Sequence, residues 1–493
     1  MTSQVRVRFA PSPTGMLHIG GLRTALYNYL FAKKHNGIFI LRIEDTDQNR
    51  YVDGAENDII TALKWAGMPY DEGPDAPGSY GPYRQSERSA IYQTYAAQLI
   101  GQGHAYYAFD TPEAIEAMRE RLKSEVNKNP KYDAASRTQM TNSLTLSPEE
   151  TRQRIESGSP YVIRLKTEPG EVVTFHDQIR GHVSFQTREL DDQVLMKSDG
   201  LPTYHLANVV DDHLMGVTHV IRGEEWLSSA PKHILLYRYL GWEAPVMAHL
   251  PLIMSPAGGK LSKRNAEELG IPVNVRDYIS GGYDPEALVN FLAFLGWSPG
   301  DDREILSMKE LIGAFRLEDV SKAGAVFNID KLTWYNEQYL RSRSDEHLIP
   351  LLQQELELQN ISGFNSAYLE SVIGLMKERV SRPAEILEQG RFFFEAPSHY
   401  DEKALKKAWK AETPELLLEF LTAVEAMKSY HAAALKQALS DIVEQRGLGF
   451  GKLMLPARIA VTGMGGGPDL FETMELLGKD EVVGRIQKAL NTL

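Results

Sequence analysis

Two short segments carry residue types suited to phosphate chemistry. Residues 18–21 read His-Ile-Gly-Gly, follow a loop rich in proline and glycine, and begin a stretch in which apolar residues recur on one helical face. A helix N-terminus offers unpaired N–H groups and a positive dipole end, and both favour phosphate. Residues 260–264 read Lys-Leu-Ser-Lys-Arg and lie in a second loop, after the apolar residues 250–254. Lysines in such a loop could meet negative charge that develops on a phosphate group.

Each segment also has an ordinary structural interpretation. A histidine before two glycines commonly marks no more than a helix start, and a basic pentapeptide is commonly a solvated loop. Neither loop contains the common phosphate-binding patterns G-x-G-x-x-G and G-x-x-x-x-G-K-[ST]. Residues 463–467 are rich in glycine but follow no convincing strand, so we interpret them as a flexible turn.

The elements around these loops indicate an open α/β sheet. Residues 5–9 alternate between apolar and polar side chains as a strand does, and residues 38–43 form a continuous apolar run typical of a covered parallel strand. The acidic segment 44–47 follows that run directly. Because such sheets bind ligands at the carboxyl ends of their strands, we expect the first loop and these carboxylates to share one crevice. A helix-capping turn would explain Asp45 or Asp47 equally well.

Further along, the pattern predicts an insertion between two halves of the sheet, followed by strands that lead into the lysine loop. Everything beyond residue 341 is expected to be helical. Predicted helices cover residues 53–66, 86–100, about 230–240, 287–296 and 308–314, and predicted strands of the resumed sheet cover residues 192–197, 203–210, 217–221 and 250–254.

Together and in this order, the two loops resemble the HIGH and KMSKS signatures of class I aminoacyl-tRNA synthetases. Further segments resemble bacterial glutamyl-tRNA synthetases almost word for word. The likeness covers the whole chain in order, strongly through about residue 340 and loosely beyond. The segments concerned are residues 8–21, 42–47, 81–88, 199–213 and 222–226.

The resemblance implies an α/β fold, with a class I Rossmann-type parallel-sheet catalytic domain, an inserted acceptor-binding domain and an all-helical anticodon-binding region after them. The catalytic domain would be split over residues 1–82 and 194–254, with the acceptor-stem-binding insertion at 83–193. A lysine-loop and stem-contact domain would cover 255–340, and the helical anticodon-binding domain 341–493. A helical end favours the bacterial glutamyl type over its glutaminyl and archaeal-type relatives.

The implied reaction is ATP-dependent attachment of L-glutamate to tRNA(Glu). The glutamate carboxylate attacks the α-phosphate of ATP, giving glutamyl-adenylate and pyrophosphate, and a terminal ribose hydroxyl of the tRNA then displaces AMP. Such chemistry depends on positioning and on cations or N–H donors that meet developing charge.

Three alternatives stay open at this point. One is a short paralogue that attaches glutamate to a modified tRNA base, although the helical residues beyond 341 count against it. Another is a non-discriminating synthetase that also charges tRNA(Gln). The last is a catalytically inactive RNA-binding or regulatory homologue, which the presence of His18, Lys263, Arg8 and Arg222 disfavours.

The resemblance also assigns site residues one by one. An arginine suits the side-chain carboxylate of glutamate because its fork can pair with both oxygens. For Arg222, an ion pair with Glu224 or Glu225 is the structural alternative. The implied catalytic residues are His18, Lys260 and Lys263, the ATP-binding residues are His18, Gly20, Gly21 and Lys263, the glutamate-binding residues are Arg8, Ala10, Ser12, Glu44, Tyr204, Asn208 and Arg222, the candidate contact to the tRNA terminus is Glu225, and the candidate anticodon contact is Arg379.

Composition adds its own limits. At 493 residues the chain is long enough for three or more domains. It has no cysteine, which excludes disulfides and thiolate metal sites, so we expect no structural zinc, although some members of the family carry a cysteine zinc site in the insertion. Mg²⁺ is expected to arrive with ATP. The net charge of −13 does not exclude RNA, since phosphate binding needs only a local basic surface.

The same features lead to an expectation about where in the cell the protein is located. No apolar run is long enough to span a membrane and no signal peptide is recognised, so we expect no membrane contact. The lack of cysteine fits a cytoplasmic enzyme. The resemblance implies a monomer.

Overall fold

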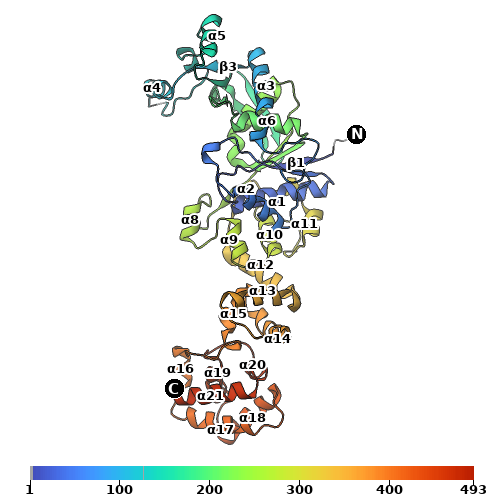
Figure 1. Cartoon of the computed structure of the whole chain (residues 1–493), viewed down its shortest axis with the longest axis vertical. Helices are drawn as coiled ribbons and strands as arrows, with labels where there is room; N and C mark the ends of the chain where they lie inside the picture. Colours follow the sequence, from blue (N-terminus) through green and yellow to red (C-terminus); the bar gives the residue numbers. More distant parts are fainter. Residues whose placement is uncertain (1–3, 126) are drawn as a thin grey trace. The chain divides into compact units, whose positions relative to one another are not determined.

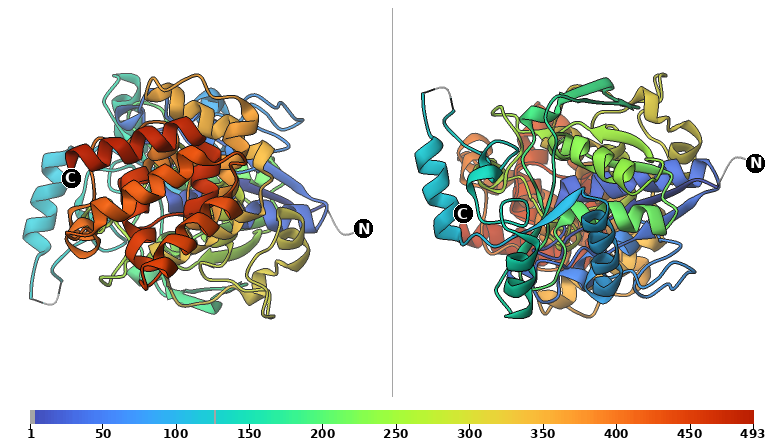
Figure 2. Two further views of the ribbon diagram at one scale, coloured as in Figure 1. Left: turned by 90° about the horizontal axis from the view of Figure 1, so that it is seen from below. Right: turned by 90° about the horizontal axis from the view of Figure 1, so that it is seen from above.

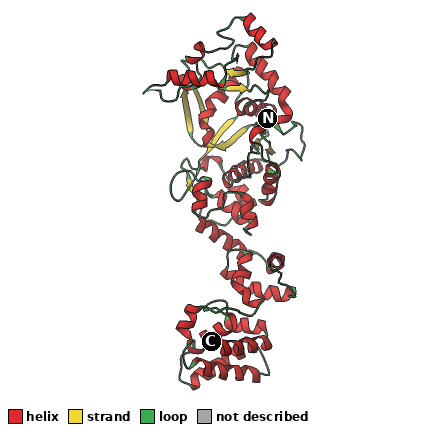
Figure 3. Cartoon of the chain, turned by 60° about the vertical axis from the view of Figure 1, so that its left-hand side comes forward, coloured by secondary structure: helices red, strands yellow, loops and turns green. Residues whose placement is uncertain are grey.

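The computed structural model describes residues 4–125 and 127–493 (Figure 1). They form two compact units. The first extends to Gly281 and includes Pro285–Lys331, and the second consists of Gly282–Asp284 and Leu332–Leu493. All the strands lie in the first unit, and the described residues of the second unit are helical or irregular (Figure 3). None of the helices described is long and apolar enough to cross a membrane.

Parallel strands form the centre of the first unit, as predicted. Strand β1 (Arg6–Phe9) pairs with β2 (Ile38–Leu41) in parallel, and β8 (His219–Gly223) pairs in parallel with β9 (Val246–Leu250). The backbone N–H of Thr218 donates to the carbonyl of Arg6 at 2.9 Å, which places the start of β8 beside β1. The carboxyl ends of β1 and β8 therefore lie near one another.

The second sheet continues past β9 to an edge. Strand β5 (Val172–Asp177) pairs with β9 through Asp177 and Met247, and it forms an antiparallel hairpin with β6 (Gly181–Gln186). The strand order is β6-β5-β9-β8. This pairing places Asp177 beside β9, close to the site described below.

Helix α1 (Ile19–Lys34) covers the strands β1, β2 and β8. Its buried face includes Leu22, Leu26 and Leu30, so the helical spacing seen in the sequence is the face that packs on the sheet. The side-chain amide of Asn28 donates to the carbonyl of Ile221 at 3.0 Å. The helix is thereby fixed on the sheet with its first turn at the carboxyl ends of the strands.

One predicted strand is wrong. Residues 204–210 belong to helix α6 (Tyr204–Leu214), and Thr203 is its N-cap. Leu206, Val209 and Val210 are buried along one helical face, and in so short an apolar run periodicity does not separate a strand from a helix.

Two further strand predictions are correct in place but not in partner or length. Strand β7 (Val194–Met196) does not resume the parallel sheet, because it pairs antiparallel with β4 (Val162–Leu165), which in turn pairs with β3 (Ala105–Ala108). The predicted strand 250–254 is divided at Pro251, which has no N–H to donate, so β9 ends at Leu250 and β10 begins at Ile253.

The other predicted helices are present, with ends that differ from the predicted ones by at most three residues. Strand β10 (Ile253–Met254) pairs in parallel with β11 (Ala325–Val326), and the remaining helices of this unit surround the sheets (Figures 1 and 2). They are α2 (Ala55–Trp65), α3 (Ser89–Gly101), α4 (Pro112–Leu122), α5 (Pro148–Glu156), α7 (Ala230–Tyr239), α8 (Lys263–Glu268), α9 (Val275–Ser280), α10 (Pro285–Ala293) and α11 (Met308–Ala314), and α12 (Ile329–Ser342) begins at the border of the units.

The second unit consists of packed helices with two apolar cores. One core contains Leu352, Ile373 and Phe393, and the other contains Phe420 and Leu439. In the second core α17 packs against α18, α19 and α21, and Figure 2 shows these helices side by side. The helices are α13 (Asp345–Leu358), α14 (Ser366–Met376), α15 (Pro383–Gly390), α16 (Glu402–Ala408), α17 (Thr413–Ala426), α18 (Ala432–Gln445), α19 (Gly451–Thr462), α20 (Leu470–Leu477) and α21 (Lys479–Thr492).

Candidate active site

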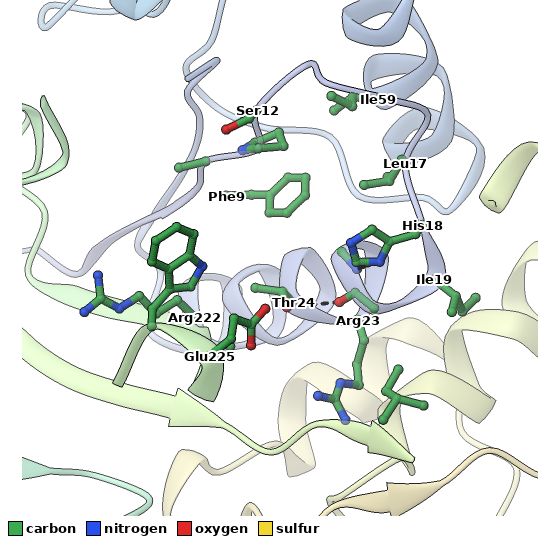
Figure 4. Close-up of a pocket in the computed structure, with 18 of the residues that line it drawn as sticks. Phe9, Ser12, Leu17, His18, Ile19, Arg23, Thr24, Ile59, Arg222 and Glu225 are labelled. Atoms are coloured by element: carbon green, nitrogen blue, oxygen red, sulfur yellow. Dashed lines mark hydrogen bonds between the residues drawn. The ribbon is translucent and has the colours of Figure 1, made fainter. Parts of the chain in front are cut away.

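A cavity of about 700 Å³ lies where β1, β8 and the first turn of α1 meet. Figure 4 shows the imidazole of His18 on one side of it and the guanidinium of Arg222 on the other. Most of the residues predicted for the site line this cavity. They are Arg8, Ala10, Ser12, His18, Gly20, Gly21, Glu44, Tyr204, Arg222, Glu225 and Lys260.

The other three predicted residues lie elsewhere. Asn208 is one layer behind the wall, where its side-chain oxygen accepts from Nη2 of Arg8 at 2.9 Å. Lys263 is the first residue of α8, but its side chain lies outside the described part of the structure. Arg379 is exposed in the second unit, close enough to Arg458 that its charge adds to burial in lowering the pKa of Arg458.

His18 both caps helix α1 and lines the cavity. It is the N-cap of α1, and its Nδ1 accepts the backbone N–H of Gly21 at 3.0 Å. An accepting Nδ1 leaves the proton of the neutral ring on Nε2. Burial, and then the charge of Lys260, lower the pKa of His18, so the ring stays neutral near pH 7. The capping and cavity interpretations are therefore compatible.

The two glycines after His18 lie where neighbouring side chains leave little room for a Cβ. A Cβ on Gly20 would lie 3.2 Å from the His18 ring, and a Cβ on Gly21 would lie 2.8 Å from the side chain of Leu17. A side chain at residue 20 would therefore press on the imidazole, and one at residue 21 would displace the end of the Leu17 side chain.

A tight turn brings the lysine loop to the cavity. Gly258 and Gly259 have φ values of +94° and +73°, which favour glycine, and the N–H of Leu261 donates to the carbonyl of Ile253 at 2.8 Å. Lys260 thereby lies on the wall. The segment after α8 is joined to the first loop, since the N–H of Ile19 donates to the carbonyl of Val273 at 2.9 Å.

One wall of the cavity is a compact cluster of buried charges. Arg8 donates through Nε to Asp212 at 3.0 Å, and Arg42 donates through Nη1 to the same carboxylate oxygen at 2.7 Å. Nη2 of Arg42 also donates to Glu44 at 3.0 Å. All four side chains are at most 6% exposed. Each arginine of this wall therefore has at least one carboxylate partner.

Burial and pairing act in opposite directions on these carboxylates. Burial raises the pKa of Glu44, and Arg42 and Arg8 only partly offset it. Burial also acts to raise the pKa of Asp212, but Arg8 and Arg42 outweigh it, so the pKa of Asp212 is lowered. Asp212 is thus the fixed anion that orients both arginines.

A second wall holds Arg222 in a different way. Its Nε donates to Nε2 of His249 at 3.1 Å, and its Nη1 donates to the hydroxyl of Tyr204 at 3.0 Å and to Nδ1 of His233 at 3.1 Å. Its Nη2 is buried and has no hydrogen-bond partner. Arg222 itself is 4% exposed.

The predicted structural alternative for Arg222 is not formed. Glu224 pairs with Arg180 and accepts the backbone N–H of Leu252 at 3.0 Å. Among the described residues, no carboxylate oxygen lies within 4.0 Å of the Arg222 guanidinium. Arg222 is therefore a buried cation without an ionic partner among the described side chains.

The carboxylates in residues 44–47, directly after β2, make different contacts. Glu44 lines the cavity, whereas Asp45 accepts from the backbone N–H and the hydroxyl of Ser86 at 2.8 and 2.6 Å. Asp47 makes an exposed ion pair with Arg50 and caps no helix through its side chain. Neither carboxylate forms a helix-capping turn through its side chain, and Asp45 instead ties this loop to the segment before α3.

Several residues around the site were not assigned a role from the sequence. Arg42 and Asp212 are charged residues within the segments that match the family, as are Arg8 and Glu44, so the sequence did mark them as candidates. No sequence signal marked His233 or His249, because a single histidine in an apolar segment is usually a core residue. Trp226, also within a matched segment, packs its ring 4.1 Å from that of Tyr204. No group of three or more described His, Asp or Glu residues is arranged to hold a metal ion.

Comparisons with known proteins agree with this geometry. Residues 4–334 match the family model described as tRNA synthetases class I (E and Q), catalytic domain, and residues 345–490 match an anticodon binding domain. A glutamate–tRNA ligase of Amoebophilus asiaticus is 49% identical over 100% of this chain and 99% of its own length. The chain belongs to the glutamyl-tRNA synthetase family. A glutamate–tRNA ligase of Parabacteroides distasonis is 51% identical over 99% of both chains.

Solved structures of the family have the same fold. A glutamate tRNA ligase from Elizabethkingia meningosepticum, crystallised in complex with its amino acid, superposes with a TM-score of 0.94 and is 47% identical over the full length of both chains. A glutamate–tRNA synthetase from Elizabethkingia anophelis gives a TM-score of 0.92 at 46% identity.

These matches confirm the predicted family, the class I fold and the helical anticodon region. Because the chain spans 99% or 100% of these relatives' lengths, the short-paralogue alternative is not supported. The domain limits and the roles of individual site residues remain predictions.

Proposed function

We propose that this chain is an enzyme that attaches L-glutamate to tRNA(Glu) through a glutamyl-adenylate, consuming ATP and releasing AMP and pyrophosphate. The observation that carries the proposal is the buried Arg222, which lines the cavity with its Nη2 unpartnered and no carboxylate beside it. A buried cation of this kind is costly unless a ligand supplies the anion. The side-chain carboxylate of glutamate would do so.

The glutamate end of the cavity follows from this assignment. Arg222 and Tyr204 would bind the side-chain carboxylate, and Glu44 would accept from the ammonium group. Arg8 is held by Asp212 and Asn208, so it would act as a fixed donor on the same wall. Ala10 and Ser12 would contact the substrate from the loop after β1.

The ATP end would be formed by the start of α1 and the lysine loop. Helix α1 presents its N-terminus to the cavity, and Gly20 and Gly21 would let phosphate approach the backbone closely. The neutral His18 would donate through Nε2 to the phosphates, and Lys260 and Lys263 would meet the charge that develops when the bond between the α- and β-phosphates breaks. Mg²⁺ would come with ATP, and we propose no structural zinc.

The RNA would meet the remaining parts of the chain. Residues 83–193 would bind the acceptor stem and 255–340 would contact the stem, beside the split catalytic domain of 1–82 and 194–254. Residues 341–493 would bind the anticodon, with Arg379 as a candidate contact, and Glu225 would lie near the tRNA terminus. We propose that the enzyme acts as a monomer in the cytoplasm.

The deciding experiment is charging of purified tRNA with labelled glutamate, in parallel reactions with tRNA(Glu) and tRNA(Gln). Product on tRNA(Glu) alone is the expected result and would identify a discriminating enzyme. Product on both would replace the proposal by the non-discriminating alternative. No product on either, with ATP still bound, would overturn the catalytic assignment in favour of an inactive homologue.

A further inference from the structure

Three histidines from different elements stand behind Arg222. His249 on β9 and His233 on α7 are 0% exposed, and His205 on α6 is half-buried. Nδ1 of His249 lies 2.6 Å from Asp177, and Nε2 of His233 lies 3.1 Å from Nδ1 of His205. With the two bonds from Arg222, these contacts form one continuous network that ends at Asp177 and His205.

Arg222 fixes the proton positions throughout this network. A guanidinium only donates, so Nε2 of His249 and Nδ1 of His233 must both accept and carry no proton. The proton of His249 is then on Nδ1, where it is donated to Asp177. The proton of His233 is on Nε2, where it is donated to His205. Both imidazoles next to Arg222 are thus neutral, and burial lowers the pKa of each, with the charge of Arg222 acting in the same direction.

Asp177 keeps the His249 ring in this orientation. Its Oδ1 accepts the backbone N–H groups of Ile179 and Arg180 at 3.0 and 2.8 Å, so the carboxylate itself cannot turn freely. It lies on the far side of the His249 ring from Arg222. The arginine therefore gains a fixed acceptor without direct contact with a negative charge.

The choice of acceptor decides how much charge remains for a ligand. A carboxylate would satisfy the N–H groups of Arg222 and also cancel its charge, as Asp212 does for Arg8. A neutral imidazole satisfies the N–H group and leaves the charge in place. Of the five N–H groups of a guanidinium, the three on Nε and Nη1 are used by His249, Tyr204 and His233, and the two on Nη2 are not.

We propose that His249 and His233 are positioning residues for amino-acid selection. They hold the Arg222 guanidinium through neutral acceptors, so that its Nη2 and its full positive charge remain for a substrate carboxylate, and an uncharged amide is disfavoured. This inference rests on the proposed function, in which Arg222 binds the side chain of glutamate.

The test uses a matched pair of variants of the full chain, His233→Asn and His233→Asp. Both side chains can place an oxygen where Nδ1 accepts from Arg222, but only the second adds a negative charge. The measurement is aminoacylation of tRNA(Glu) at varied glutamate and at varied ATP. We expect His233→Asn to stay within about 5-fold of the wild-type KM for glutamate. We expect His233→Asp to raise it about 10-fold to 100-fold, because the added carboxylate competes with the substrate carboxylate, whose hydrogen bond to the charged Arg222 has about this value.

A second pair tests the other acceptor. His249→Gln keeps an acceptor near the position of Nε2, whereas His249→Leu removes it. We expect His249→Leu to raise the KM for glutamate by about 10-fold or more with a nearly unchanged KM for ATP, and His249→Gln to recover most of the loss. The preference for glutamate over glutamine in kcat/KM should fall with His249→Leu and with His233→Asp.

Controls separate this inference from general damage and from the proposed function. His219→Gln alters a histidine on β8 that bonds to Thr218 and not to Arg222, and it should leave both KM values near wild type. Equal KM values for glutamate in His233→Asn and His233→Asp, or an equal rise in both KM values with His249→Leu, would overturn the positioning role. A wild-type chain that charges no glutamate would instead overturn the proposed function.

Discussion

The two walls of the cavity both use buried arginines, but they treat the charge in opposite ways. On the first wall Arg8 and Arg42 share the carboxylate of Asp212, and Arg42 also binds Glu44. On the second wall Arg222 contacts neutral imidazoles and a tyrosine hydroxyl. An arginine paired with a carboxylate is held rigidly, and most of its positive charge is cancelled. An arginine held by neutral groups keeps its charge for a ligand.

This difference suits glutamate, which carries a positive ammonium group as well as a negative side-chain carboxylate. The ammonium group of glutamate would face the wall that carries Glu44, and the side-chain carboxylate would face Arg222. Burial strengthens both interactions, because water screens little of the field inside such a cavity. The comparison can be tested by removing the charge from each wall separately.

The largest effect should come from Arg222→Gln. This change removes a buried cavity cation that has no ionic partner among the described residues, and we expect kcat/KM for glutamate to fall about 1,000-fold, mainly through KM, since a charged pair is lost in a desolvated site. Steady-state aminoacylation with tRNA(Glu) is the measurement. Arg238→Gln is the matched control, because Arg238 makes an exposed ion pair with Glu171. An unchanged affinity for glutamate would remove Arg222 from the pocket.

Asp212→Asn should destabilise the buried charge cluster of the first wall. The substitution keeps the shape of the side chain but leaves two buried arginines without their common anion. We expect the free energy of unfolding of the first unit to fall by about 3–5 kcal/mol. Urea unfolding monitored by tryptophan fluorescence provides the measurement, with the exposed Asp47→Asn as a control that should stay close to wild type. If both variants unfolded alike, Asp212 would not be the central anion of this wall.

His18→Asn should separate the helix cap from the group that faces the cavity. Asparagine is a good N-cap, so the melting temperature should change little, but the Nε2–H donor is lost. We expect kcat to fall about 100-fold, as for removal of one donor to a developing oxyanion. ATP–pyrophosphate exchange in the presence of tRNA would measure it. A full rate with asparagine would leave His18 with the capping role alone.

The smallest effect concerns acid stability and belongs to the second wall. Burial, and then Lys232, lower the pKa of His205 to about 4, and burial lowers that of His233 well below its ordinary value. The unfolded chain therefore binds protons below about pH 6.5 that the folded chain does not bind. Stability should be highest above this pH and should fall as the pH drops toward 4, by at most about 1.4 kcal/mol per pH unit for each group.

The variant His205→Asn measures this contribution. Its oxygen can still accept from His233, but the side chain no longer titrates, so the loss of stability between pH 7 and pH 5 should be smaller than in the wild type. Urea midpoints at these two pH values give the comparison. Identical pH dependence in the two proteins would show that His205 does not contribute.

Much of the site could be predicted because its residues stand in continuous segments. The cap at His18, the glycines after it and the lysine turn each depend on contacts within a few residues, and the structure forms them as local units. Residues 203–210 show where this reasoning failed. Their apolar spacing allowed a strand, and the observed helix α6 is what brings Asn208 and Asp212 to Arg8 on one helical side.

Motifs and local periodicity were enough to predict the family, the α/β class, the helical second unit and many, though not all, of the groups that line the cavity. Only the tertiary structure decided which charges cancel. Asp212 is joined to Arg8 across 204 positions of the chain, and His249 reaches Arg222 and Asp177 from a neighbouring strand. Whether a buried arginine keeps its charge for a ligand depends on such distant partners, and no local pattern encodes them.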